Sequence, residues 1–165
     1  MDELRTLYES IGLREPQTYV QSGNVVFRAS QRDLISLCKR IESAIEHRFG
    51  FHAHVLLRTT ADLREVVARN PFAGRNAIDH SKLLVTFLPA EPDAETKSRL
   101  RLVNPHPEEV HLFGRELFIY FPSGIGRSKL TPVLEKILKK SGTSRNFNTV
   151  TKLLEIAEKL DIGRR

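Results

Sequence analysis

The stretch that best suits a chemical task is a glycine-rich turn between an apolar run and a helix. Gly124 and Gly126 turn the backbone, and a helical pattern follows from residue 130. Backbone N–H groups left over at such a turn, beside positive side chains, form a site for an anion. The candidate ligands are Gly124, Gly126, Arg127, Ser128 and Lys129, where Arg127 and Lys129 supply charge and Ser128 a hydroxyl donor.

The alternative for this turn is purely steric. The turn is not a P-loop, because the four-residue spacer before Gly-Lys-Ser/Thr is missing. It is not a dinucleotide-binding fingerprint either, because position 129 is lysine rather than a third glycine. A tight connection from strand to helix would by itself require both glycines. Both interpretations stay open. A turn alone explains the glycines, but it does not require the Arg-Ser-Lys run, which fits an anion site.

A second polar cluster precedes the last helix and consists of Arg145, Asn146, Asn148 and Thr149. Arg and Asn side chains offer planar, directional donors for phosphate or base edges. The simpler interpretation is that Asn148 or Thr149 caps the helix while Asn146 bonds loop backbone. If both clusters face one cleft, they form one site for a phosphate-bearing partner, either a small molecule such as a nucleotide or a nucleic acid.

Gln21, Ser22 and Asn24 are secondary candidates for the same kind of ligand. They lie between two strand-like runs, where Gly23 and Asn24 can supply the positive φ angles of a hairpin turn. A single strand with a glycine bulge is the alternative. The turn interpretation is favoured, because it explains Gly23 and Asn24 without a ligand.

Metal and nucleophile chemistry are weakly indicated. His52 and His54 share one face of an expected strand, but no third metal ligand follows at a telling spacing. A solvated strand face is favoured, and we expect no metal and no cofactor. Cys38 lies on the apolar stripe of an expected helix and indicates a core residue. No catalytic residue can be assigned, because neither serines nor carboxylates show a catalytic pattern.

Composition narrows the class of protein. The 165 residues are 40% hydrophobic and 28% charged, which is typical of a soluble globular protein. No run approaches the roughly 18 apolar residues that cross a bilayer, so we expect no membrane partner. The net charge of +6 permits a phosphate-bearing partner without requiring one. A single cysteine and the absence of a secretory signal pattern predict a cytoplasmic protein.

The order of the expected elements predicts an internal duplication. Residues 82–165 read as strand, helix, strand-turn-strand, helix, strand and a closing helix, which is the βαββαβ unit of ferredoxin-like folds plus a C-terminal helix. Residues 1–72 read as the same unit without its first strand, and their last expected strand is at 52–58, before a short helix. We therefore predict an α+β fold of two ferredoxin-like halves, the first incomplete, joined by a connector at 73–81.

The missing strand has a physical consequence. The first strand of a ferredoxin-like unit is normally interior, so its loss leaves a gap between the hairpin and residues 52–58. Either that strand slides over, or another segment fills the position, or apolar surface stays poorly covered. We expect low stability or a homo-oligomer formed through the unfilled sheet position.

Four stretches, in this order, carry a family resemblance: residues 19–27 (YVQSGNVVF), 70–72 (NPF), 126–131 (GRSKLT) and 143–150 (TSRNFNTV). They resemble bacterial proteins of domain-of-unknown-function family 1697, whose members are small, soluble and uncharacterised. The resemblance implies an α+β fold of two ferredoxin-like halves and no established activity. Two departures stand out. Members usually begin with an extra strand and a glycine loop that this sequence lacks, and Phe147 stands where they usually have tryptophan.

Three hypotheses on function follow. The first is a module that binds a phosphate-bearing ligand at residues 123–129 and 145–149. The second is an enzyme of unknown reaction that uses the same cleft, for which a titratable group with a perturbed pKa beside Arg127 would be the sign. The third is an inactive, truncated family member, as a lost N-terminal strand would suggest.

Overall fold

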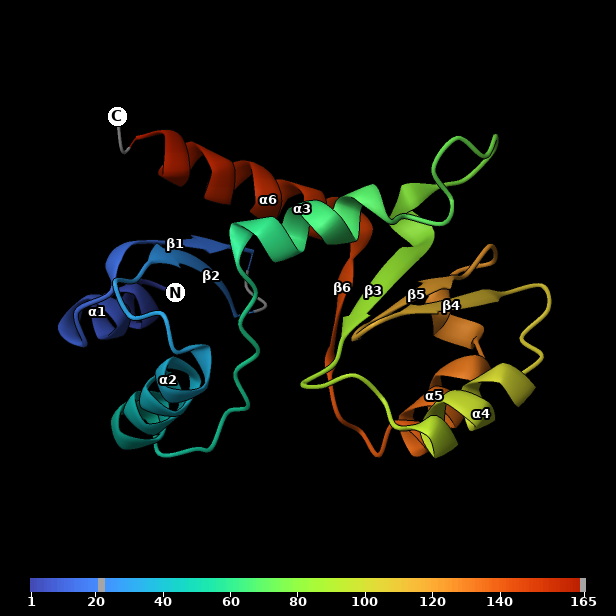
Figure 1. Cartoon of the computed structure of the whole chain (residues 1–165), viewed down its shortest axis with the longest axis horizontal. Coiled ribbons are helices and arrows are strands. Elements are labelled where there is room, and N and C mark those ends of the chain that lie inside the picture. The colour runs from blue at the N-terminus through green and yellow to red at the C-terminus, as the bar shows by residue number, and fades with distance from the viewer. Residues whose placement is uncertain (21–22, 164–165) are drawn as a thin grey trace. The chain divides into compact units, whose positions relative to one another are not determined.

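A computed structural model describes residues 1–20 and 23–163 (Figure 1). The chain forms two compact units: unit 1 comprises Met1–Thr60 and the C-terminal stretch from Lys152, and unit 2 comprises Ala61–Thr151. The boundaries expected from the sequence, at 72 and 82, stay a prediction. The elements are α1 (Asp2–Ser10), β1 (Arg14–Tyr19), β2 (Asn24–Arg28), α2 (Leu34–Phe49), α3 (Thr60–Ala68), η1 (His80–Lys82), β3 (Leu83–Phe87), α4 (Ala94–Leu102), β4 (Glu109–Phe113), β5 (Glu116–Tyr120), η2 (Ile125–Arg127), α5 (Leu130–Ile137), β6 (Thr143–Asn146) and α6 (Phe147–Ile162).

Unit 1 packs two helices against a hairpin. β1 and β2 pair antiparallel, so the hairpin interpretation of this region is confirmed. Asp33 caps α2 by accepting hydrogen bonds from two backbone amides, and Gly50 ends the helix with a φ of 76°. The buried core side chains come from both helices and the turn between α1 and β1: Leu7, Tyr8, Leu13, Leu37, Ile41 and Ile45.

The strand expected at residues 52–58 does not form. This segment pairs with no strand in the described part of the chain, and the sheet of unit 1 has only β1 and β2 there. Its inward side chains, Ala53, Val55 and Leu57, nevertheless pack against the core of unit 1. These three side chains are partly buried, whereas His52 and His54 are exposed, but a ladder also needs a neighbouring strand.

Unit 2 contains the complete ferredoxin-like repeat. Its elements follow the order β3-α4-β4-β5-α5-β6, and its sheet has the strand order β4-β5-β3-β6 with antiparallel pairing throughout. The α+β, ferredoxin-like fold class predicted from the sequence is confirmed. The short polar strand β6 forms as expected, because β3 offers it an edge to pair with.

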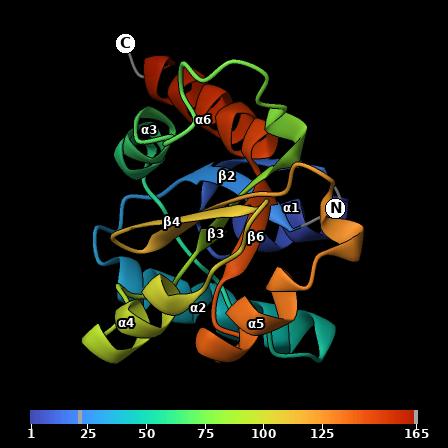
Figure 2. The same ribbon diagram turned by 90° about the vertical axis from the view of Figure 1, so that its right-hand side faces the viewer.

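One face of the unit 2 sheet is covered by α4 and α5, which lie side by side in both ribbon views (Figure 2). The core on this face includes Leu117, Ile119, Leu130 and Leu134. Alternate residues point to the opposite face, where Val85 and Phe118 are fully buried. The central strands of unit 2 are thus covered on both sides.

Candidate functional site

The strand register of unit 2 brings the two predicted clusters to the same end of the sheet. β5 and β6 both run antiparallel to β3, so they run parallel to each other and finish together. Tyr120 at the end of β5 pairs with Leu83, and Asn146 at the end of β6 pairs with Leu84. The glycine-rich loop leaves β5 at this end, and α6 begins there. We call this region the sheet-end site.

The glycine-rich loop has the geometry of a tight connection with a short helical turn. Gly124 has a φ of 85°, in the left-handed region that favours glycine, and precedes the 3-10 turn η2. The Gly124 amide donates to Phe121, and the Ser128 amide donates to Ile125. Ser128 Oγ also accepts from the Leu130 amide at 3.0 Å. Hydrogen bonds within the loop therefore hold its conformation without a ligand.

The two positive side chains of the loop are exposed to solvent. Arg127 and Lys129 are exposed, and neither belongs to an ion pair among the described residues. Nearby, Thr131 Oγ1 in the first turn of α5 is buried without a hydrogen-bond partner within that same part of the chain. A buried hydroxyl in this state costs free energy unless something else bonds it. The start of α5 thus carries cationic side chains together with an unsatisfied donor.

Lys82 also reaches this region, although the sequence pattern marks it only as the start of a buried strand. Its Nζ donates to the carbonyl oxygen of Pro122 at 3.0 Å, and its own carbonyl accepts from the Phe121 amide. Lys82 therefore fixes the base of the glycine-rich loop and adds an ammonium group there. No signal in the sequence relates Lys82 to residues forty positions away.

In the second cluster, Asn146 is engaged by the fold. Its Nδ2 donates to the carbonyl of Ser81 at 2.6 Å, and its Oδ1 accepts from the Asn148 amide at 2.9 Å. Asn146, rather than Asn148 or Thr149, therefore caps the start of α6, which corrects the capping expected from the sequence. Asn148 is exposed and Thr149 is half-buried, so their side chains remain candidates at the sheet-end site.

Arg145 lies on the other face of the sheet. It pairs with Val85, whereas Asn146 pairs with Leu84, and successive strand residues point to opposite faces. Its Nη1 donates to Thr143 Oγ1 at 2.7 Å, so the guanidinium reaches back along β6 rather than toward its end. Half-burial lowers the pKa of Arg145. The register thus brings Asn146, Asn148 and Thr149 toward the glycine-rich loop and turns Arg145 away from it.

The third cluster belongs to unit 1. Asn24 is buried, and its Nδ2 donates to the Tyr19 carbonyl across the hairpin turn at 3.2 Å. Gly23 has the positive φ angle, 74°, that the turn interpretation assigns to it, whereas Asn24 begins β2 and is not among the described residues with a positive φ. Gln21 and Ser22 lie outside the described residues.

His52 and His54, also in unit 1, stack edge to face with ring centroids 4.7 Å apart, and His52 Nδ1 is 3.7 Å from Glu46 Oε2. Within residues 1–20 and 23–163, no group of three or more His, Cys, Asp or Glu side chains is arranged to hold a metal ion. The histidine pair with one carboxylate therefore remains below the usual ligand count of a structural zinc site.

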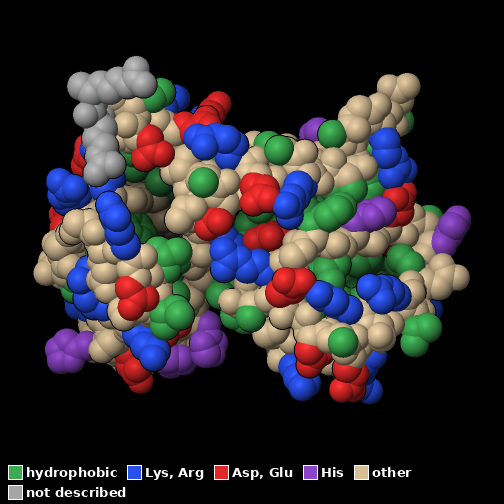
Figure 3. Space-filling view, in the orientation of Figure 1, with side chains coloured by type: hydrophobic (Ala, Val, Ile, Leu, Met, Phe, Trp, Pro, Cys, Tyr) green, Lys and Arg blue, Asp and Glu red, His purple; other side chains and the backbone are tan. Residues whose placement is uncertain are grey.

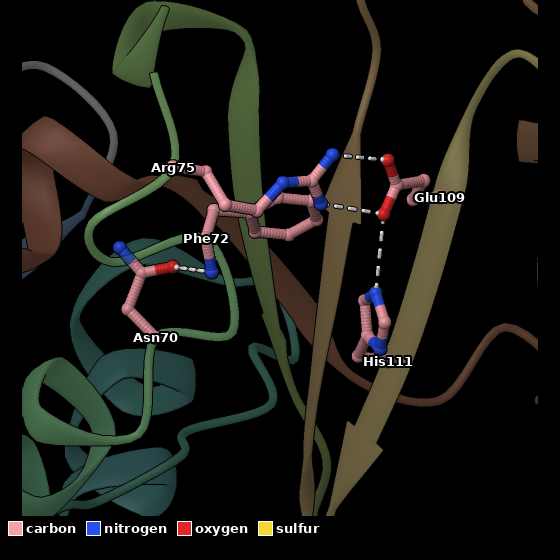
Figure 4. A network of polar contacts seen from close by, with 5 residues as sticks. All are labelled: Asn70, Phe72, Arg75, Glu109 and His111. Carbon is pink, nitrogen blue, oxygen red and sulfur yellow. Dashed lines mark hydrogen bonds and ion pairs between the residues drawn. The ribbon is translucent and has the colours of Figure 1, made fainter. Parts of the chain in front are cut away.

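A polar network crosses the β4 side of unit 2 (Figure 4). Arg75 donates two hydrogen bonds to Glu109, at 2.8 and 2.9 Å, and its guanidinium lies 5.0 Å from the centroid of the buried Phe72 ring. His111 Nε2 is 3.4 Å from Glu109 Oε2. The Arg75 hydrogen bonds lower the pKa of Glu109 below its usual range. Asn70 Oδ1 accepts from the Phe72 amide, so the network fastens the loop that follows α3.

Unit 2 also has a hollow of about 340 Å³ at the opposite end of its strands from the sheet-end site. It is lined by α3 and by the β4–β5 turn, and its charged side chains are mixed in sign: Asp62, Glu65, Arg69, Glu91, Arg115 and Glu116. On the face shown in Figure 3, basic and acidic side chains are likewise interspersed rather than gathered in one large basic patch. The hollow therefore lacks the single-sign field that would concentrate an anion.

Comparison with known proteins identifies the family. The family model described as "Protein of unknown function (DUF1697)" matches residues 1–118. The chain belongs to the DUF1697 family. A search of curated proteins finds no match for this DUF1697 chain. The matched span ends within β5, so the glycine-rich loop and the start of α6 lie outside it.

A solved structure supports the fold. It is that of the conserved bacterial protein SP0830 from Streptococcus pneumoniae, which is similar to this DUF1697 chain with a TM-score of 0.74 and 17% sequence identity. The similarity covers 96% of this chain and 88% of that one. At this identity the likeness concerns the fold alone. Among the described residues, no helix is both long and apolar enough to cross a membrane.

Proposed function

We propose that the protein binds a phosphate-bearing ligand at the sheet-end site of unit 2. The observation that carries the proposal is that β5 and β6 run parallel to each other and end at the same end of the sheet, beside Leu83 and Leu84. The glycine-rich loop and the start of α6 extend from that end. Arg127 and Lys129 supply the positive charge, and the backbone of Gly124–Gly126 allows close approach of a phosphate.

The neighbouring residues divide into ligands and supports. Ser128 and Thr131 carry hydroxyl groups at the start of α5, and Thr131 is the one that has no partner in the described part of the chain. Lys82 and Asn146 hold the base of the site through carbonyl bonds. Asn148 and Thr149 complete the site from the start of α6. In this arrangement Arg145 stabilises β6 and does not touch the ligand.

Binding is favoured over catalysis on one observation. Near this end of the sheet, hydrogen bonds from Ser81 lower the pKa of the Asp79 carboxyl. A carboxylate stabilised in its charged form in this way is a poor general base near neutral pH. The enzyme alternative requires instead a group whose pKa is moved toward neutrality.

The test is calorimetric titration of the protein with inorganic phosphate, a nucleoside triphosphate and a short single-stranded oligonucleotide. We expect the Arg127→Ala/Lys129→Ala variant to lose at least tenfold in affinity, because each lost charge-assisted contact is worth about 1.5–3 kcal/mol. The matched control is Arg101→Ala/Lys136→Ala, which removes two exposed positive charges from α4 and α5 of the same unit. Equal affinities of the two variants for every probe would refute the proposal.

Thr131→Val separates a ligand contact from a defect of packing. If the hydroxyl bonds the ligand, the variant binds phosphate several-fold more weakly. If the hydroxyl is only an unsatisfied group, the variant binds equally well and is more stable, because a buried orphan hydroxyl has been removed. Comparing phosphate with the oligonucleotide distinguishes a small-molecule site from a nucleic-acid site.

A further inference from the structure

The hollow of unit 2 is a concave surface of about 340 Å³ at the end of the sheet where β4 turns into β5. One wall is α3 and the other is the β4–β5 turn, which lies below α3 in Figure 2. A volume of this size falls within the roughly 300–1,000 Å³ of small-molecule sites. The hollow is therefore large enough for a small organic molecule.

The floor of the hollow is apolar. Val66 of α3 and Phe118 of β5 line it and are buried. Phe113, at the end of β4, packs its ring edge to face against Phe118 with the centroids 5.9 Å apart, yet Phe113 remains 36% exposed. A ring that is fixed on one side and open on the other offers apolar surface for a ligand to cover. We therefore expect the ligand to carry an apolar group.

The backbone that carries Arg115 is held in place by the hairpin. Gly114 has a φ of 59°, which suits the first residue of a two-residue turn, and Phe113 pairs with Glu116 across that turn. The Leu88 amide donates a hydrogen bond of 2.9 Å to the Arg115 carbonyl. Arg115 therefore lines the hollow from a fixed main chain, and binding need not order this segment first.

Arg115 stands between two carboxylates that also line the hollow. Its Nη2 is 3.6 Å from Asp62 Oδ2, and its Nε is 4.0 Å from Glu116 Oε1. Both separations exceed the 2.8 Å of the Arg75–Glu109 ion pair in the same unit. Ion pairs this loose and partly open to solvent contribute little to stability. A ligand can therefore exchange these two pairs for contacts of its own at small cost.

We propose that the hollow binds a free α-amino acid with an apolar side chain. Arg115 takes the ligand carboxylate in its guanidinium fork, and Asp62 and Glu116 take the ligand ammonium group. The apolar side chain of the ligand lies against the Phe113 ring. The mixture of signs that disfavours a phosphate here suits a zwitterion, because each of its charges meets the opposite charge. This inference is independent of the sheet-end site.

The test is a titration of the full chain followed by two-dimensional NMR, with three probes that differ by one charged group. L-Phenylalanine carries both groups, phenethylamine lacks the carboxylate, and 3-phenylpropionate lacks the ammonium group. We expect L-phenylalanine to bind at least about tenfold more tightly than either analogue, because each analogue loses one charge-assisted contact. The changes in chemical shift should centre on residues 62–69 and 113–118.

Two variants assign the contacts. Arg115→Gln should weaken L-phenylalanine to the level of phenethylamine without weakening phenethylamine itself. Asp62→Asn should weaken L-phenylalanine toward the level of 3-phenylpropionate. The matched control is Arg101→Gln, which removes an exposed positive charge from α4 and does not line the hollow. The Arg127→Ala/Lys129→Ala variant of the sheet-end site should also leave this binding unchanged.

The probe series on the unmodified protein decides the proposal, so a variant that fails to fold leaves the test intact. Equal affinities for the three probes would mean unspecific adsorption and would overturn the proposal. Binding of phenethylamine as tight as that of L-phenylalanine would mean a site for cations only, and would overturn it as well. So would changes in chemical shift confined to residues outside the hollow, or no saturable change with L-phenylalanine.

Discussion

The two units of this chain place similar elements around sheets of different completeness. In unit 2 the central strand side chains Val85, Leu117 and Phe118 are fully buried. In unit 1 the corresponding strand side chains, such as Val25 and Phe27, remain partly exposed, although α2 is long and well capped. Helices therefore form from their own sequence patterns and caps, whereas burial of the strands depends on whether the middle of the sheet is occupied.

The largest expected effect comes from a matched pair of phenylalanines. Phe118 on β5 is 0% exposed, and Phe27 on β2 is partly exposed while its ring meets Tyr8 edge to face. Phe118→Ala should destabilise unit 2 by about 3–5 kcal/mol, whereas Phe27→Ala should cost unit 1 roughly half of that. Hydrogen exchange under native conditions measures the two units separately. Equal losses would mean that the open sheet of unit 1 buries its residues as well as the closed one.

Alkaline pH should affect unit 1 through Tyr8. Burial raises the pKa of Tyr8 to about 12, with a smaller contribution from Cys38. An unfolded tyrosine has a pKa near 10, so this contribution to stability is complete below about pH 10 and is lost as the pH rises toward 12. The loss is roughly 2–3 kcal/mol at most. Urea unfolding at pH 8 and pH 11 should show a smaller drop in Tyr8→Phe than in the natural protein; an equal drop would contradict this role.

Most of the fold could be predicted from the sequence because its local signals agree with its topology. Asp33 and Gly50 bound α2, Gly114 turns the β4–β5 hairpin, and the order of elements predicts β6 despite its polar residues. Residues 52–58 show what a local sequence pattern does not predict. Their alternation separates the exposed His52 and His54 from neighbours that pack partly against the core, but no pattern in a segment says whether a second strand is present to bond its backbone.

The candidate site was only partly predictable, because direction is a property of the assembled sheet. The sequence places Arg145 and Asn146 next to each other, yet pairing with β3 sends their side chains to opposite faces. Lys82 and Thr131 carried no signal, since one begins a buried strand and the other begins a helix. The sequence did indicate the two segments that follow β5 and β6 as candidates, and both lie at the same end of the sheet.

A smaller effect is expected from Glu42, whose carboxylate bonds the Val55 amide. Glu42→Ala should weaken the anchoring of residues 53–57 by about 1–2 kcal/mol, because a hydrogen bond to a charged group is lost. Exchange of the Val55 amide should then rise roughly tenfold, while the amides of β6 keep their rates. Glu42→Gln retains an acceptor and is the matched control. If both variants leave Val55 unchanged, side chains of α2 do not replace a ladder in unit 1.

The smallest effect concerns unit 2 and has the opposite dependence on pH. Hydrogen bonds from Arg75 lower the pKa of Glu109, and His111 contributes further. Because the folded pKa is depressed, this stabilisation is present above the ordinary glutamate pKa of about 4.3 and is lost as the pH falls below it. Glu109→Gln should therefore remove part of the acid sensitivity of unit 2 at a cost below about 1 kcal/mol near neutral pH, as is usual for an ion pair open to solvent. Acid titration followed by exchange of residues 70–79 measures it. If acid loosens that loop equally in the natural protein and in Glu109→Gln, the Arg75–Glu109 ion pair does not stabilise the loop. Packing of Phe72 would then hold the loop in place.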